Sequence, residues 1–589
     1  MNRKYLTAAV CAAAALAGCS SAPAPQESTP EAEKGMFTPG TYTATAAGRN
    51  GDITVTTEFS ADAIESISYE SQETETIGVP AMDAMTEEII AAQSLAVDSV
   101  SGATISSDAF LEAVRDTVKQ AGGDPEAMSA SEGKEKEETV YETEADIIVV
   151  GGGAAGMTAA ITAHNLGASV ILLEKSAVLG GNTICSANGI NAADSAVQLA
   201  DEKYQAAQAS VEGLEGLQMN NPDADEDLVK AFAENSGEVI DWLGTLGVNF
   251  EVDIQEDDRN SEQNYYMLKD TTDGSTAITM INKVTAELKE SGITVYTLMD
   301  AHDLVTDETG RVTGVTAMND QGEDVTFSGK TVLLATGGFG QNSDLVGEVN
   351  PALANAVTDE VAPTTGEGLL MARELGAATA NLDAIQTFPH VVPGYGMILP
   401  FSLPGGFTPD ALYVNNNAER FTAEGFEIPD AILAQDGGEV YCIFTENVLN
   451  DGLKPLVGSG FIQEGENAAE LAGKLGLDPE KLQETIDAFN EDIADGTDDA
   501  FGRDKNLNPI EGKLYGYRFG VGAHYFMGGV LINENTQVIK DDGSVIDGLY
   551  AAGEVTGGFH GTFRVDGSGL GDSFTFGRIA GRAMAAEAQ

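Results

Sequence analysis

The segment ADIIVVGGGAAGMTAAITAHNLGASVILLEK, residues 145 to 175, decides the fold of this chain. It reads as an apolar strand, a glycine turn, an alanine-rich helix and a second apolar strand, which together form a βαβ unit. The turn glycines Gly151, Gly153 and Gly156 follow the spacing GxGxxG, which allows a tight turn, a close approach to a pyrophosphate and packing of helix on strand. Glu174 ends the second strand, where a carboxylate can accept hydrogen bonds from both ribose hydroxyls. The segment therefore predicts a dinucleotide site, and the carboxylate argues against a ribose 2′-phosphate.

Two later segments have the same strand-to-glycine character. They are TVLLATGGFG at 331 to 340 and GLYAAGEVTGG at 548 to 558, so the dinucleotide fold is predicted to be discontinuous. Between them, at about 385 to 520, the sequence pattern changes. This stretch includes helical segments such as DPEKLQETIDAFNEDIAD. We interpret this stretch as an inserted α+β cap domain.

The sequence pattern of the N-terminal quarter differs from that of the rest of the chain. Alternating segments such as TYTATAA and GDITVTTEFS precede a helical stretch, DAFLEAVRDTVKQAGG, that ends on glycines, which predicts a small α+β domain. The acidic, serine-rich residues after it lack periodicity and read as a linker. The fold class is thus α/β, a Rossmann-like domain with an inserted cap, preceded by a small α+β domain. The predicted boundaries are 1–19 signal peptide, 20–36 tether, 37–122 small domain, 123–144 linker, 145–384 first part of the dinucleotide domain, 385–520 cap and 521–589 second part.

The N-terminus, MNRKYLTAAVCAAAALAGCSS, has two basic residues, a short apolar run and then LAGC. This pattern predicts a lipoprotein signal in which cleavage leaves Cys19 as the acylated first residue, followed by a proline-rich tether. An ordinary signal peptide with a chance cysteine is the alternative. We expect a lipid-anchored protein on the cell membrane, facing away from the cytoplasm.

Charge excludes some partners. The chain has 30 lysines and arginines against 94 aspartates and glutamates, a net charge of −64, so nucleic acid and anionic membrane surfaces are poor partners. Any site for an anionic substrate must be built locally from the few arginines. Once the signal is removed, Cys185 and Cys442 are the only free thiols, no CxxCH sequence for c-type haem is present, and no metal site is predicted.

Several glycine-rich motifs follow the βαβ unit in a fixed order: GGNT at 180, SANGINAA at 186, ATGGFG at 335, AAGEVTGG at 551 and GSGLGDSFTFGR at 567. This set resembles the succinate dehydrogenase and fumarate reductase flavoprotein family over residues 145 to 589. The resemblance implies non-covalent FAD. The implied FAD-binding residues are Gly151, Gly153, Ala155, Gly156, Glu174, Lys175, Gly181, Asn182, Thr183, Ala187, Asn188, Gly189, Gly338, Tyr525, Glu554, Gly569 and Leu570.

The resemblance also implies the catalytic residues. In the family, hydride passes between the flavin and the β-carbon of an unsaturated carboxylate while a cap arginine delivers a proton. The segment YVNNNAERF resembles VNxxGxRF and implies Arg420 as proton donor, reprotonated by carboxylates such as Glu419 or Glu424. HYFMGG resembles HxxMGG and HGTFR resembles HGxxR, which imply that His524 and Arg564 bind and polarise the substrate carboxylate.

The chain departs from fumarate reductases where these bind a second carboxylate. The family histidine in QxHP is replaced by Phe388 in QTFP, and no Thr-Glu pair follows. An apolar side chain there suits an alkyl or aryl group, because an unpaired buried carboxylate is costly. We therefore expect a urocanate- or cinnamate-like substrate bound against Phe388. Alternatively, His390 takes the vacant role.

In the small domain, DSVSGATISS at 98 to 107 resembles the sequence of FMN-binding domains that a flavin transferase modifies. The resemblance implies covalent FMN on Thr104. Electrons are then expected to pass from a membrane or extracellular donor to FMN, to FAD and to the substrate, in anaerobic respiration. The alternatives are a fumarate reductase, a flavin oxidase running in the opposite direction, or an inactive extracellular electron carrier; the oligomeric state stays open.

Overall fold

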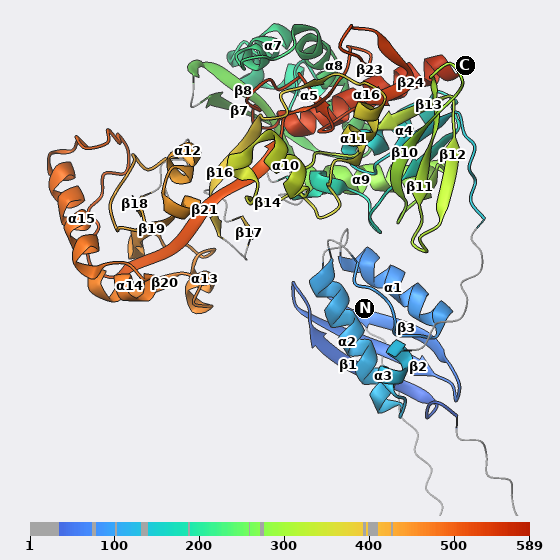
Figure 1. The fold of residues 1–589 in the computed structure, drawn as a ribbon, viewed down its shortest axis with the longest axis horizontal. Coiled ribbons are helices and arrows are strands. Elements are labelled where there is room, and N and C mark those ends of the chain that lie inside the picture. The colour runs from blue at the N-terminus through green and yellow to red at the C-terminus, as the bar shows by residue number, and fades with distance from the viewer. Residues whose placement is uncertain are drawn as a thin grey trace, which may run out of the picture.

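The computed structural model describes residues 35–73, 78–100, 103–130, 140–186, 189–257, 260–270, 276–392, 396–397, 410–425 and 428–589. Three bodies are visible in Figure 1: a small domain (residues 35–130), a large domain built around a parallel sheet, and a cap (residues 410–513). The predicted fold class is confirmed. The predicted signal peptide and the first part of the tether lie outside the described residues.

The small domain is a three-stranded antiparallel sheet covered by helices. In β2 (Asp52–Phe59), alternate residues including Ile53, Val55 and Phe59 are buried, as expected for a strand with one face on a core. The other elements are β1 (Gly40–Ala47), β3 (Ile64–Glu70), α1 (Gly78–Ala92), α2 (Thr104–Gln120) and α3 (Pro125–Ala130).

Helix α3 makes the small domain longer than predicted. Met128 is buried in the small-domain core, and its carbonyl oxygen accepts hydrogen bonds from Ser94 Oγ at 2.9 Å and Leu95 N at 3.2 Å. The domain therefore continues to residue 130 rather than ending at 122. A six-residue helix is too short for its periodicity to be detected in an acidic segment.

The large domain contains a six-stranded sheet of order β23-β24-β13-β4-β5-β9. All neighbours are parallel except β23 and β24. Strands β4, β5 and β13 are buried on both faces, which explains their continuous apolar runs. Their bounds are β4 (Ile147–Val150), β5 (Val170–Leu173), β9 (Thr294–Tyr296), β13 (Thr331–Leu334), β23 (Gln537–Ile539) and β24 (Val545–Ala551).

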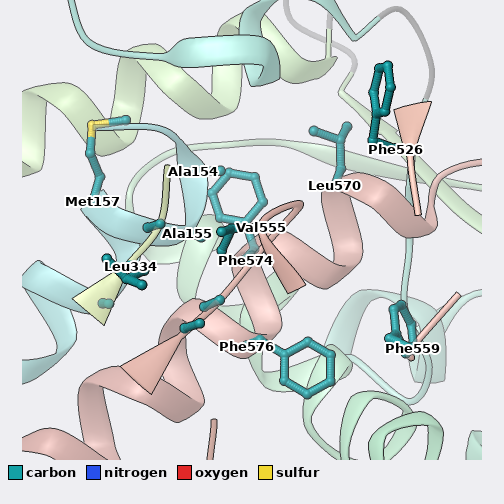
Figure 2. Close-up of a cluster of buried hydrophobic side chains, with 14 of the residues drawn as sticks. Ala154, Ala155, Met157, Leu334, Phe526, Val555, Phe559, Leu570, Phe574 and Phe576 are labelled. Atoms are coloured by element: carbon teal, nitrogen blue, oxygen red, sulfur yellow. The ribbon is translucent and has the colours of Figure 1, made fainter. Parts of the chain in front are cut away.

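Helices α4 (Ala154–Asn165) and α16 (Ser568–Ala588) pack together beside this sheet. Figure 2 shows Phe574 and Phe576 of α16 in one apolar cluster with Ala154, Ala155 and Met157 of α4. The first turn of α4 meets the middle of α16, since a Cβ on Gly577 would lie 2.6 Å from the Ala155 carbonyl oxygen. These two helix starts form part of the candidate site.

Other elements complete the large domain. The small sheets are β10-β11-β12, β6-β8-β7 and β15-β22-β25. Their strands are β6 (Ile190–Asn191), β7 (Phe250–Asp257), β8 (Asn260–Asp270), β10 (Asp300–Thr306), β11 (Val312–Met318), β12 (Asp324–Ser328), β15 (Thr379–Ala380), β22 (Gly529–Leu531) and β25 (Thr556–Gly557). The helices are α5 (Ala196–Ala200), α6 (Glu202–Ala206), α7 (Val211–Met219), α8 (Glu226–Thr245), α9 (Thr276–Ser291), α10 (Ser343–Val349), α11 (Glu367–Glu374), η1 (Gly181–Cys185) and η2 (Pro351–Leu353).

The cap is joined to the large domain by two long strands, β16 (Ile385–Val392) and β21 (Leu514–Phe526), which pair antiparallel. Figure 1 shows β21 running from the large domain into the cap. The predicted boundary at residue 520 thus falls inside one continuous strand. The other elements of this part are β14 (Val357–Thr358), β17 (Gly396–Met397), β18 (Leu412–Val414), α12 (Pro429–Leu433), β19 (Glu439–Thr445), α13 (Lys454–Gly458), β20 (Gln463–Gly465), α14 (Ala468–Leu475) and α15 (Pro479–Asp492), with short η4, η5 and η6 turns.

Among the described residues, no helix combines the length and the apolar character needed to cross a membrane.

Candidate active site

A long cavity begins at the carboxyl ends of β4 and β5 and runs past the start of α16. Most of the predicted FAD residues line it: Gly151, Gly153, Ala155, Glu174, Lys175, Gly181, Asn182, Thr183, Tyr525, Glu554, Gly569 and Leu570. The same cavity is lined at its other end by Phe388, His524 and Arg564. The structure thus brings together the predicted cofactor residues and three of the four predicted substrate and catalytic residues.

The glycine turn after β4 has the geometry that the sequence predicts. Gly151 has φ +110°, and a Cβ there would lie 2.2 Å from the Ala335 carbonyl oxygen. A Cβ on Gly156 would lie 1.9 Å from the Gly151 carbonyl oxygen, so a side chain would separate α4 from the turn. Gly153 has no such neighbour and faces the cavity. The start of α4 is therefore open to a phosphate, which the helix dipole favours.

Glu174 lies at the ribose end of the predicted cofactor position. Its carboxylate accepts hydrogen bonds from Gly152 N and Ser176 N, both at 2.7 Å. Burial raises the pKa of Glu174, and these two amides oppose that shift. The neighbouring Lys175 pairs with Glu367 at 2.5 Å. The residues present fit an adenosine ribose and a pyrophosphate, as FAD requires.

Two buried carboxyl groups meet in the middle of the cavity wall. Asn182 Nδ2 and Phe526 N donate to Glu554 at 3.1 Å each. A Cβ on Gly338 would lie 2.6 Å from Glu360 Oε1 and 3.2 Å from Glu554 Oε1, so the two carboxyls are adjacent. Burial and the charge of Glu554 raise the pKa of Glu360 well above its usual range. Glu360 therefore holds its proton to higher pH than an ordinary carboxyl group.

At the far end of the cavity, His524 lies close to Asp359 and to the ring of Phe388. His524 Nδ1 lies 2.8 Å from Asp359 Oδ2, and the Phe388 ring centroid lies 4.4 Å from that of His524. The pairing of β14 with β21 holds Asp359 beside His524, because it aligns Thr358 with Ala523. Phe388 thus lines the cavity beside His524, and its contact with a substrate stays a prediction.

Arg564 is the only arginine among the described residues that line the cavity. Its Nε donates to Gln386 Oε1 at 2.8 Å, and its guanidinium lies 4.9 Å from the centre of the Tyr525 ring. An ion pair with Asp566 at 3.8 Å is the only other charged contact in the described part of the chain. The side chain is oriented by these contacts, while its Nη atoms have room for a carboxylate ligand.

Arg420 does not line the cavity in this structure, and its role as proton donor stays a prediction. Its side chain is 6% exposed inside the cap. Nε and Nη2 donate to Glu424 at 2.9 and 2.7 Å, while Nη1 and Nη2 donate to Asp498 at 2.8 and 2.7 Å. The guanidinium lies between the rings of Phe489 and Phe501, at 4.9 and 4.8 Å. These contacts hold the Arg420 side chain inside the cap and join it to Glu424, one of the predicted relay carboxylates.

Two carboxylates set the pKa of Arg420. Burial alone would lower that pKa, but the hydrogen bonds and charges of Asp498 and Glu424 outweigh burial and raise it. Glu424 also pairs with Arg503 at 2.9 Å, so the predicted relay carboxylate belongs to this closed cluster. Glu419 instead lies near Lys481 at 3.7 Å on the cap surface.

His390 does not take the role that Phe388 leaves vacant. The side chain is fully buried, and both ring nitrogens are hydrogen-bonded to tyrosines: Nε2 to Tyr413 Oη and Nδ1 to Tyr517 Oη at 2.8 Å. Burial lowers the pKa of His390 to about 3. The residue has φ +67° and is not among the described residues that line the cavity.

Thr104, the residue predicted to carry FMN, lies at the start of helix α2. Thr104 is the first residue of α2 and is exposed. Nearby, Ser99 Oγ is hydrogen-bonded to Asp108, and Ser107 Oγ accepts from Val100 N at 3.2 Å. An exposed hydroxyl at a helix N-terminus suits a phosphoester, because the amides and the dipole favour its negative charge.

Some predicted residues lie elsewhere. Three predicted FAD residues do not line the cavity: Gly156, Gly189 and Gly338. Three other predicted residues lie outside the described residues: Cys19, Ala187 and Asn188. Conversely, Asp359 and Glu360 line the cavity although no sequence motif marks them. A carboxylate immediately after a short strand is too common a pattern to single out.

Comparison with known proteins agrees with these two cofactor sites. Residues 146–570 match the family described as FAD binding domain, and residues 48–119 match the FMN-binding domain family. Urocanate reductase of Eggerthella lenta is 32% identical over 99% of both chains. NADH:acrylate oxidoreductase of Vibrio harveyi is 30% identical over 92% of this chain and 61% of its own length.

Among solved structures, the open conformation of a flavocytochrome c3 fumarate reductase superposes with a TM-score of 0.69, at 29% identity, over 79% of this chain and 84% of that one. The match includes the large domain and extends the likeness from sequence to architecture. With its glycine turn, its cavity and its N-terminal FMN-binding domain, the chain belongs to the FAD-binding flavoprotein family of the urocanate and fumarate reductases.

Proposed function

We propose that this protein reduces the C=C bond of an α,β-unsaturated monocarboxylate whose tail is aromatic or alkyl, as in urocanate or cinnamates. The observation that carries the proposal is the convergence of Arg564, His524 and Phe388 at the end of the flavin cavity. The relatives named above take urocanate, acrylate and fumarate according to their names. All three compounds are α,β-unsaturated carboxylates.

The charges of the cavity favour one substrate carboxylate rather than two. In the described part of the cavity wall, Arg564 and Lys175 are the cationic side chains, and Lys175 is already paired with Glu367 at the ribose end. A second carboxylate would lie against Phe388, where no partner compensates its desolvation. A ring or alkyl group would instead bury apolar surface there and stabilise the complex.

The chain's own residues orient the substrate and polarise it. Bound FAD supplies the hydride chemistry. Arg564, held by Gln386 and by the Tyr525 ring, presents its Nη atoms to the substrate carboxylate in a bidentate arrangement. Because negative charge grows on the carboxylate side as hydride reaches the β-carbon, this fixed cation stabilises the transition state more than the ground state.

The small domain completes the proposal. FMN is attached by a phosphoester to the Thr104 hydroxyl by a flavin transferase and passes electrons to FAD. A donor in the membrane or outside the cell supplies them, and acylated Cys19 holds the protein at the outer face of the cell membrane. Mass spectrometry of protein co-expressed with a flavin transferase tests the first link: no flavin adduct on Thr104 would remove it.

The substrate class is tested with an anaerobic panel of urocanate, cinnamates, acrylate and fumarate, using reduced methyl viologen as donor. The monocarboxylates with a ring should give the highest kcat/KM. Fumarate as the best substrate would overturn the apolar-pocket argument. Failure of every enoate, with FAD bound and reducible by viologen, would favour the alternative of an electron carrier.

A further inference from the structure

We infer that Glu360 and Glu554 form a single proton-binding site in the wall of the FAD cavity, and that this site keeps one negative charge, rather than two, beside bound FAD. Both side chains line the cavity, and both are buried. This role goes beyond the proposed enoate reduction, because it concerns the reduction of bound FAD, whichever substrate is used afterwards. The ligand of the site is a proton taken from water.

The four carboxyl oxygens of the pair have three N–H donors among the described residues. Phe526 N donates to Glu554 Oε1 and Asn182 Nδ2 donates to Glu554 Oε2, both at 3.1 Å. Gly340 N donates to Glu360 Oε2 at 2.6 Å. The fourth oxygen, Glu360 Oε1, is buried and has no hydrogen-bond partner in the described part of the chain. One donor is therefore missing, and a proton on the pair supplies it.

The oxygen without a partner lies beside the second carboxyl group. A Cβ on Gly338 would lie 2.6 Å from Glu360 Oε1 and 3.2 Å from Glu554 Oε1, so both oxygens lie beside the same glycine. The two carboxyl groups are close enough to form a hydrogen bond when one of them carries a proton. Without that proton, two negative charges would repel each other in a buried place.

The fold holds both groups in this arrangement. Asn182 Oδ1 accepts from Val361 N at 2.9 Å and from Thr364 Oγ1 at 3.3 Å, which orients its Nδ2 atom toward Glu554. Asn182 thus binds both Glu554 and the segment that follows Glu360. Moving one carboxyl group away from the other would break these hydrogen bonds, so the proton is the simpler way to relieve the repulsion.

Neither carboxyl group forms an ion pair with a lysine or arginine in the described part of the chain. Of the cations that line the cavity, Lys175 pairs with Glu367, and Arg564 donates to Gln386. The other ionisable side chains on this part of the wall are Asp359 from the same segment, Cys185 from η1, and His524 and Tyr525 from β21. The nearby carboxylate of Asp359 makes a second negative charge on the pair still more costly.

Both acids have the shifts expected of a shared proton. Burial and the neighbouring Glu554 raise the pKa of Glu360 well above its usual range. Burial also raises the pKa of Glu554, although its hydrogen bonds oppose that shift. Because the two groups interact this closely, the proton belongs to the pair rather than to one residue.

The pair therefore responds to the electrons held in the cavity. Two electrons that enter bound FAD add negative charge nearby, which strengthens the binding of a proton to the pair. At a pH where the pair has lost its proton, it takes up one H⁺ from water: an O–H bond forms on a carboxyl oxygen, and no electron passes to or from the pair. At lower pH the proton is already bound and none is taken up.

The test is a redox titration of bound FAD over pH 6 to 10, using the full chain loaded with FAD and produced without a flavin transferase. Glu360→Gln supplies a permanent N–H donor and leaves the single charge of Glu554. The two proteins should have the same midpoint potential at pH 6. At higher pH the wild-type potential should fall below that of Glu360→Gln. Its slope should be steeper by one proton per two electrons, about 30 mV per tenfold change in proton concentration.

A second measurement detects the proton itself and does not depend on a variant. In infrared spectra, wild type should show the C=O stretching band of a protonated carboxylic acid at pH 7, and the band should disappear as the pH is raised. Glu360→Gln should lack the band at pH 7. Asp303→Asn removes an exposed carboxylate that does not line the cavity and should match wild type in both measurements.

Parallel potential curves for wild type and Glu360→Gln over the whole range, or absence of the C=O band at pH 7, would overturn the inference. Failure of the proposed function is a different result, because neither measurement uses a substrate. A protein that reduces no enoate would still show the band and the steeper slope. The absorbance of released FAD identifies any variant that has not loaded.

Discussion

Arg420 in the cap and Arg564 at the cavity are both buried arginines, but their guanidinium groups have different partners. Arg420 donates four hydrogen bonds to two carboxylates. Arg564 donates one, to the neutral Gln386, and its nearest carboxylate is 3.8 Å away. Burial alone does not distinguish a structural arginine from a functional one. The difference lies in whether the protein satisfies the guanidinium or leaves part of it for a ligand.

The same contrast holds for the acidic residues. Asp498 is bound to Arg420, whose hydrogen bond holds the pKa of that carboxyl well below its usual range. Asp359 has one oxygen on His524 and one without a partner among the described residues. In the cap, ionic groups form a closed cluster. At the cavity they form a set with open positions, as expected of a binding site.

The largest expected effect separates the two arginines by stability. Arg420→Met should lower the free energy of unfolding by about 3–5 kcal/mol, because it leaves Glu424 and Asp498 as buried charges without their partner. Urea denaturation measures this change. If Arg420 is also the proton donor, turnover per bound FAD, measured below the denaturation range, should fall by at least about a hundredfold. Unchanged turnover would contradict the proton-donor prediction, and unchanged stability would contradict the structural role.

Arg564→Lys should lower kcat/KM for the enoate by about a hundredfold. A lysine keeps the charge but cannot form the bidentate contact or the contact with the Tyr525 ring. The unfolding free energy and FAD content should change little, which is the reverse of the cap variant. Steady-state kinetics with reduced viologen provides the measurement, and unchanged kcat/KM would contradict the assignment.

Phe388→His should raise the ratio of fumarate to monocarboxylate kcat/KM by about tenfold, because it supplies a partner for a second carboxylate where the ring now lies. Phe388→Leu is the matched control. It keeps an apolar wall and should leave the ratio near that of the wild type. A ratio that both substitutions shift equally would mean that size, rather than polarity, sets the preference.

The smallest effect concerns Glu360. Its pKa is raised in the folded protein, so the folded state holds a proton that the unfolded chain releases above the ordinary carboxyl range. Stability is therefore lost as pH rises from about 5, by at most about 1.4 kcal/mol per pH unit. Glu360→Gln mimics the protonated acid and should flatten this slope, as thermal denaturation between pH 5 and 8 can measure. An unchanged slope would show that Glu360 is ionised in the folded protein.

Local sequence was sufficient for the parts of the fold that short segments encode. The βαβ unit, its glycine turn and Glu174 lie within one 31-residue segment, and each has a steric or hydrogen-bonding reason that the sequence displays. The discontinuous sheet could also be predicted, because β13 and β24 repeat the same strand-to-glycine pattern. The predicted end of the small domain was wrong because α3 depends on packing against Ser94 and Leu95.

Partners distant in the sequence could not be predicted. Arg420 meets Asp498 across 78 residues, and His524 meets Asp359 across 165. The motif around Arg420 correctly placed it in the cap but did not show which carboxylates would enclose it. Likewise, His390 was open to two interpretations until its tyrosine partners were known. In each case, the role depends on the hydrogen-bond partners of a buried polar group, and only the fold determines which partners these are.

The central claim is that Arg564 binds the substrate carboxylate. It is tested most directly by titrating the oxidised holoenzyme with 3-phenylpropionate, a saturated carboxylate, and recording the difference absorbance of the bound flavin. Wild type and Arg420→Met should show the same saturable change with similar Kd, and Arg564→Lys should bind at least about tenfold more weakly. Equal Kd in wild type and Arg564→Lys, with binding lost in Arg420→Met, would contradict the account.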